Sequence, residues 1–134
     1  MNTTFFLNLV SGNVFGSKKT PAIPSKYYLG LSSTAPELDG SGVTEPGAGT
    51  GYARVELTSL SVPVNGVVTN NAAIDFAEST AEWGTMTHFV VYDALTNGNL
   101  LMYGELSASR RVEAATIMTI KLGSLNLSVV NPSA

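Results

Sequence analysis

The sequence predicts a mainly β protein, an antiparallel β-sandwich or distorted barrel preceded by one short N-terminal helix. Apolar residues recur at helical spacing near the start of the chain. From residue 27 onward, short segments alternate between apolar and polar residues, which is the period of a half-buried strand. Glycine and proline separate these segments at short intervals, and that spacing is typical of a sandwich or barrel.

The helix is expected over Thr3–Val14. Thr3 or Thr4 can cap its N-terminus, and Gly16 supplies a stop signal. The segment carries more apolar mass than a free end should, so we interpret residues 1–16 as an N-terminal helical anchor. The side chains expected to dock are Phe5, Phe6, Leu9 and Val10.

A linker over residues 17–26 leads to a β domain over residues 27–130, and residues 131–134 are expected to form a loose tail. Strands are expected at Tyr27–Ser32, Tyr52–Thr58, Val67–Val68, Ala73–Phe76, Met86–Asp93, Asn99–Leu106, Thr116–Leu122 and Leu125–Val130. Asn97–Gly98 is a strong hairpin signal between two of them.

Met86–Asp93 is the most strand-like segment of the chain. Strict alternation along it predicts one face with Thr87, Phe89 and Val91. The opposite face would then hold Met86, His88, Val90 and Tyr92.

The segment Ala35–Gly51 is rich in glycine and proline. A phosphate-binding loop would be followed by Lys-Ser/Thr and a helix. Here Tyr52-Ala-Arg54 and a strand follow instead, so we interpret Gly40–Gly51, which holds five glycines, as a flexible surface loop.

Composition narrows the functional classes. Charged residues make up 13% of the 134 residues, against a usual share of about 25%. A net charge of −3 disfavours a nucleic-acid binder, which would show a basic stripe. The chain has no cysteine and one histidine, so thiolate sites and histidine-cluster metal sites are excluded, and we expect no metal or cofactor. Neither a signal peptide nor a membrane span is predicted.

No catalytic site is expected. His88 stands mid-strand among apolar residues, which is typical of a structural histidine, and no Gly-x-Ser-x-Gly elbow is present. The carboxylate pairs Glu37/Asp39 and Glu78/Glu82 could serve glycoside hydrolysis only across a substrate cleft. One tryptophan and five tyrosines are few for lining such a cleft.

Charges are segregated along the chain. Residues 1–36 carry +3, residues 37–105 carry −8 and residues 106–134 carry +2. These charges either form solvated faces or make one basic edge, from both chain ends, that meets an acidic neighbour. The candidate interface cations are Lys18, Lys19, Lys26, Arg110 and Arg111. Trp83, beside Gly84, is either a packing anchor or an interface hot spot.

Two groups of motifs carry a family resemblance. The first is Tyr28-Leu-Gly-Leu-Ser-Ser-Thr-Ala-Pro36, Gly42-Val-Thr-Glu-Pro46 and Gly51-Tyr-Ala-Arg54. The second is Trp83-Gly-Thr-Met-Thr-His-Phe89, Tyr92-Asp-Ala94, Gly98-Asn-Leu-Leu101 and Tyr103-Gly104. In this order, the motifs resemble a family of small tailed-bacteriophage virion structural proteins, often labelled tail fibre or head/tail accessory proteins.

The resemblance implies a non-enzymatic virion part, assembled in the host cytoplasm, whose partners are other capsid or tail proteins. We expect a homo-oligomer that binds neither nucleic acid nor membrane. The preferred interpretation is an accessory subunit of decoration or fibre type. The alternatives are a tail fibre component near host attachment and a module that binds host-surface carbohydrate.

Overall fold

The computed structural model describes residues 1–16 and 22–129, and it confirms the expected mainly β fold with one short helix at the start. The helix, α1, spans Thr4–Val14. The strands in the described residues are β1 (Tyr28–Ser32), β2 (Val55–Glu56), β3 (Val67–Thr69), β4 (Ile74–Asp75), β5 (Gly84–Tyr92), β6 (Leu100–Val112), β7 (Thr119–Ile120) and β8 (Asn126–Ser128). Lys18, Lys19 and the tail over residues 131–134 lie outside the described ranges, as does part of the linker.

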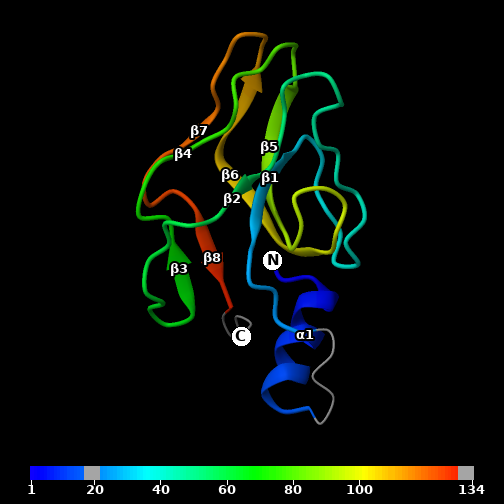
Figure 1. Cartoon of the computed structure of the whole chain (residues 1–134), viewed down its shortest axis with the longest axis vertical. Helices are drawn as coiled ribbons and strands as arrows, with labels where there is room; N and C mark the ends of the chain where they lie inside the picture. The colour runs from blue at the N-terminus through cyan, green and yellow to red at the C-terminus, as the bar shows by residue number, and fades with distance from the viewer. Residues whose placement is uncertain (17–21, 130–134) are drawn as a thin grey trace.

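The strands form sandwich-like antiparallel sheets and no closed barrel within the described residues. The main sheet has the order β2-β1-β5-β6, and β3-β8 and β4-β7 form two-stranded ribbons. Figure 1 draws both ribbons to the left of the main sheet and α1 below it. The sheet and the ribbons thereby enclose the core.

The core joins the main sheet to the ribbons. Alternation along β1 buries Leu29 and Leu31 on one face, where they cluster with Val91 of β5. Met118 and Leu125, which flank β7 and β8, close the same cluster from the ribbon side. A second, smaller cluster is formed by Val90, Tyr92 and Leu100.

A large bulge in β6 corrects the face assignment expected for β5. Met86 pairs with Arg110 but His88 pairs with Glu105, so residues 106–109 stand opposite a single residue of β5. The register shift interrupts the regular pairing of β5 with β6 between Met86 and His88. Met86, which is 1% exposed, therefore joins Val91 in the main core instead of lying with Val90 and Tyr92.

Several strand limits also differ from expectation. β6 continues to Val112 and does not end at Leu106, because Val112 is buried and its carbonyl accepts a hydrogen bond from the Trp83 backbone N–H. β2 is reduced to Val55–Glu56, since the preceding Tyr52 and Arg54 turn their side chains toward Glu45. The second half of β6, residues 107–111, is mostly polar, so apolar–polar alternation does not identify it as a strand in the sequence.

Hydrogen bonds join the glycine-rich loop over Ala35–Gly51 to the rest of the fold. The Thr34 hydroxyl lies 2.9 Å from that of Thr44 across the segment's base. The Leu38 carbonyl accepts from the Thr4 backbone N–H at 3.0 Å, and the Thr50 carbonyl accepts from the Trp83 indole at 2.8 Å. The segment thus connects α1 to the core.

The start of α1 is fixed to the outer edge of β6. The Thr3 hydroxyl accepts from the Phe6 backbone N–H at 3.2 Å, as an N-cap does, and donates to the Leu100 carbonyl at 2.7 Å. Met1 exchanges backbone hydrogen bonds with Tyr103, and the Thr3 backbone N–H donates to Leu101. Residues 1–3 therefore extend the main sheet before the helix begins.

Candidate interaction site

The helix residues expected to anchor the protein face its own β domain. Leu9 is 3% exposed, and Phe5 and Phe6 are half-buried against the main core. Val10 is also half-buried. Phe5, Phe6 and Leu9 therefore form the side of α1 that packs on the β domain.

The opposite side of α1 leaves apolar side chains in solvent. Leu7 is 48% exposed, Val14 58% and Phe15, the helix C-cap, 89%. Positions i, i+7 and i+8 lie on one side of a helix, so these residues form an apolar stripe. We call Leu7, Val14 and Phe15 the exposed stripe of α1. None of these three residues is among the predicted interface residues, although their helical spacing is readable in the sequence.

An apolar groove of about 350 Å³ opens beside the start of α1. Phe6 lines it from the helix, Val91 and Leu101 line it from the main sheet, and Val68 and Leu127 line it from the β3-β8 ribbon. Groups from three parts of the fold thus form one apolar surface, which we call the groove.

The rim of the groove is apolar too. Pro63 lines the groove, and its neighbours Val62 and Val64 are 81% and 67% exposed. Val129 also lines the groove and is 47% exposed. Single exposed apolar residues are common on protein surfaces, but a cluster of them indicates an interaction surface.

Trp83 lies in the interior. Its side chain packs edge-on against Tyr52, with ring centroids 5.3 Å apart at 90°, and against Phe76 at 6.4 Å and 83°. The residue is 6% exposed, and its indole N–H is satisfied by the Thr50 carbonyl. This placement fits the packing role considered for Trp83.

The described candidate cations are spread over the surface. The Lys26 ammonium lies 3.9 Å from Glu56, and the Arg111 guanidinium lies 2.7 Å from Glu82. Lys26 precedes β1 at the Tyr92 end of β5, whereas Arg111 pairs with Thr85 at the other end. The described cations Lys26 and Arg111 thus lie at opposite ends of the main sheet, which favours solvated faces over a single basic edge. Arg110 is exposed next to Arg111.

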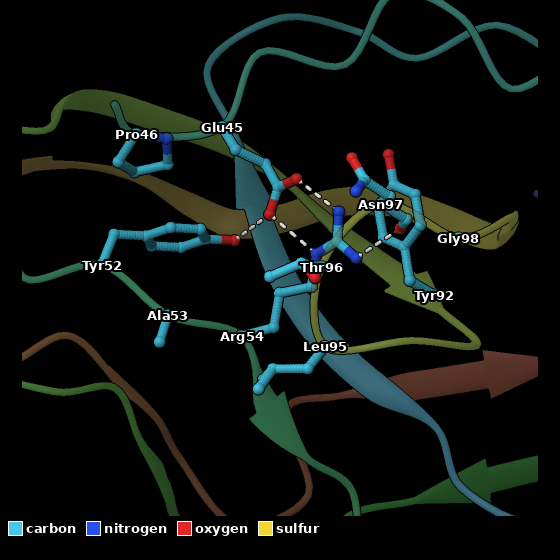
Figure 2. A pocket seen from close by; sticks show the side chains of 10 residues that line it. All are labelled: Glu45, Pro46, Tyr52, Ala53, Arg54, Tyr92, Leu95, Thr96, Asn97 and Gly98. Carbon is cyan, nitrogen blue, oxygen red and sulfur yellow. Dashed lines mark hydrogen bonds and ion pairs between the residues drawn. The ribbon is translucent and has the colours of Figure 1, made fainter. Parts of the chain in front are cut away.

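A second, polar pocket of about 540 Å³ surrounds Arg54, as Figure 2 shows. The Arg54 guanidinium donates to Glu45 from Nε to Oε2 at 3.0 Å and from Nη2 to Oε1 at 2.7 Å. Its Nη1 donates to the carbonyls of Ala94 and Asn97 at 2.8 and 2.7 Å. One side chain thus joins the Glu45 segment to the loop between β5 and β6.

Aromatic residues complete this pocket. The Arg54 guanidinium carbon lies 3.6 Å from the centroid of the Tyr92 ring, within cation–π range. The Tyr52 hydroxyl donates to Glu45 Oε2 at 2.5 Å and accepts from the Leu31 backbone N–H at 3.1 Å. The Tyr92 face that a sugar ring would stack on is therefore covered by Arg54.

The ionisation of the pocket follows from these contacts. Burial by itself would raise the pKa of Glu45, but the hydrogen bonds from Arg54 and Tyr52 outweigh it and hold that pKa below its ordinary value. Burial, reinforced by the bond to Glu45, raises the pKa of Tyr52. Glu45 stays charged and Tyr52 neutral at physiological pH. The hydrogen bonds from Arg54 and Tyr52 to Glu45 are therefore retained, and the pocket has a structural role.

We also examined the described residues for a histidine site, a metal site and a membrane-spanning helix. His88 is half-buried, and its Nδ1 lies 2.8 Å from the Thr87 hydroxyl. Across residues 1–16 and 22–129, no group of three His, Cys, Asp or Glu side chains is placed to hold a metal ion. Within these same ranges, no helix combines the length and apolarity that a bilayer crossing needs.

A small β fold whose loops are held by hydrogen bonds and whose apolar groove is open presents surfaces of the kind that structural subunits use for contact. The family model described as "Podophage GP4 fiber I protein gp80" matches residues 4–128. The chain belongs to this family and is a bacteriophage virion structural protein of fibre type. The resemblance to tailed-phage virion proteins is thereby confirmed. No curated protein sequence matches the chain.

Proposed function

We propose that the protein is a non-enzymatic accessory subunit of decoration or fibre type that docks on the virion through the surface around α1. The observation that carries this proposal is the exposed stripe of Leu7, Val14 and Phe15. Solvated apolar side chains contribute to stability only when a partner covers them. Other capsid or tail proteins and copies of the chain are the proposed partners, and neither nucleic acid nor membrane is among them.

The internal construction of the fold supports a docking role. Phe5, Phe6 and Leu9 fix α1 to the β domain, and Thr3 fixes its start to β6. The helix is thus held in one orientation, so its outer side is presented without a further ordering cost. A preorganised surface binds more tightly than a mobile one of equal area.

Attachment to a host carbohydrate is the less favoured function. The polar pocket around Arg54 has its Tyr92 ring covered by Arg54 and its Glu45 carboxylate already bonded. Glycan-array binding by the isolated protein would favour this alternative over a purely structural role.

Incorporation into particles tests the proposal. The variant L7S/V14S/F15S removes the exposed stripe and leaves Leu9 and the core intact. The matched control I117S/L122S changes side chains that are 55% and 66% exposed on the β domain. We expect purified particles to lose the stripe variant at least tenfold and to keep the control, as measured by mass spectrometry. Equal incorporation of both variants would overturn the proposed docking surface.

A further inference from the structure

Each copy of the chain carries two unpartnered apolar features. Phe15, 89% exposed, projects from the C-terminal end of α1 beside Val14. The groove opens at the other end of the helix, where Phe6 lines it. A projecting aromatic ring and an apolar groove on the same molecule are the two halves of a contact between identical chains.

A copy cannot fill its own groove with Phe15. Phe6 and Phe15 are nine positions apart on α1, and a rise of 1.5 Å per residue separates them by about 14 Å along the axis. Figure 1 shows the C-terminal end of α1 directed away from the sheets. Phe15 therefore has to find its cover on another molecule.

The groove suits an aromatic side chain. A dry apolar cavity of about 150 Å³ is large enough for a benzene ring. The groove holds about 350 Å³ between apolar side chains that include Val68, Leu101 and Leu127. Val129, which lines the groove and is 47% exposed, would be covered by the entering helix end.

Charge favours contact of the end of α1 with the β domain of a second copy over contact with the helix of that copy. Residues 1–25 carry two lysines and no acid, whereas residues 26–134 carry five bases and ten acids, a net −5. Two like-charged N-terminal segments repel each other. Next to the groove, a shallow recess shares Leu57 and Leu60 with it and is bordered by Glu56 and Asp75. A basic segment entering the groove therefore meets the Asp75 carboxylate and, beside it, Glu56, which also pairs with Lys26 of its own copy.

We propose that the end of α1, with Phe15 leading, docks into the groove of a second copy. The contact is head-to-tail, so repeated use closes a ring or extends a row of subunits. This inference rests on the proposed structural role and names the contact between copies. Its test reads the mass of the protein in solution, so it can fail while particle incorporation by the α1 surface stands.

Two single variants of the full chain separate the halves of the contact. F15E places a charge on the projecting end, and V129E places one in the groove. Both positions are exposed, so folding is retained and is checked by circular dichroism. L122E, a change outside α1 and the groove, is the matched control.

Sedimentation over a wide concentration range gives the readout. We expect the wild type and L122E to self-associate and each single variant to do so about thirtyfold more weakly, as for loss of a hot-spot side chain. Mixing F15E with V129E should restore a one-to-one pair, because the intact groove of the first accepts the intact Phe15 of the second. F15S repeats the test without an added charge.

Three results would overturn the proposal. The first is a wild type that stays monomeric at the highest concentration. The second is a V129E protein that self-associates like the wild type, which would indicate helix-to-helix pairing. The third is a mixture of F15E and V129E that contains monomers alone.

Discussion

Arg54 and Glu45 form a two-point ion pair that clamps two loops onto one face of the main sheet. The Arg54 side chain is 6% exposed and that of Glu45 21%, so the pair is largely removed from water. Arg54 also donates to the carbonyls of Ala94 and Asn97. The surface of the subunit near the β5–β6 loop therefore depends on one guanidinium.

Replacing Arg54 with alanine should be strongly destabilising. It leaves Glu45 partly buried without its partner and two carbonyls without a donor, and loss of one member of a buried pair costs about 3 kcal/mol. Thermal unfolding followed by circular dichroism measures the effect. Arg111→Ala breaks an exposed pair with Glu82 and should change the melting temperature little. Similar melting temperatures for R54A and R111A would argue against the clamp.

Acid should weaken the fold through Glu45. Its pKa is held below the ordinary value in the folded protein, whereas in the unfolded chain it is about 4.3. A depressed pKa contributes stability that is present above about pH 4.3 and is lost as pH falls through the folded-state pKa. Denaturant unfolding between neutral pH and about pH 3 measures this loss.

The variant E45Q is the control for the acid effect. It should be less stable than the wild type at pH 7, because Arg54 loses its anion. Its stability should fall less steeply with acid, since that carboxyl no longer takes up a proton. Parallel pH profiles for E45Q and the wild type would assign the acid sensitivity to other groups.

A methyl group at Gly30 of β1 should disturb the pocket around Arg54, because it would contact Tyr52 and Glu45. A Cβ there would lie 2.6 Å from the Tyr52 hydroxyl and 3.0 Å from Glu45 Oε2. We expect Gly30→Ala to cost about 1–3 kcal/mol of unfolding free energy, as overpacking does. Gly47→Ala, which meets nothing within 4 Å, is the matched control and should be nearly neutral.

A double-mutant cycle identifies the cause of that cost. Y52F removes the hydroxyl that the new methyl group meets, so the further change G30A should cost less in the Y52F background. If the cost of G30A is the same in both backgrounds, the close approach of Tyr52 is not its cause.

The sequence predicted element types better than it predicted their relationships. Alternation identifies β5, but it cannot show that residues 106–109 bulge and return Met86 to the main core, because a bulge depends on the partner strand. The five glycines of residues 40–51 predict a flexible loop, but they give no sign of what the loop over Ala35–Gly51 contacts. Its order comes from hydrogen bonds to Thr4 and Trp83, which are distant along the chain.

The two surfaces differ in how far the sequence could reveal them. Arg54 is the single base among nine acids in residues 37–105, and that isolation is a readable sign of an ion pair. The outer side of α1 was missed because apolar mass selected Phe5, Phe6 and Leu9, which face inward. The side a helix buries is decided by the sheet on which it packs, and neither the groove nor its ribbon wall is local in sequence.

A density map of the intact particle tests the central claim most directly, namely that this chain is a virion subunit docked by the outer side of α1. The predicted result is copies of this fold at regular positions, with Leu7, Val14 and Phe15 covered by a neighbouring protein chain. The contrary result is a fully occupied subunit whose exposed stripe faces solvent while another face makes all its contacts.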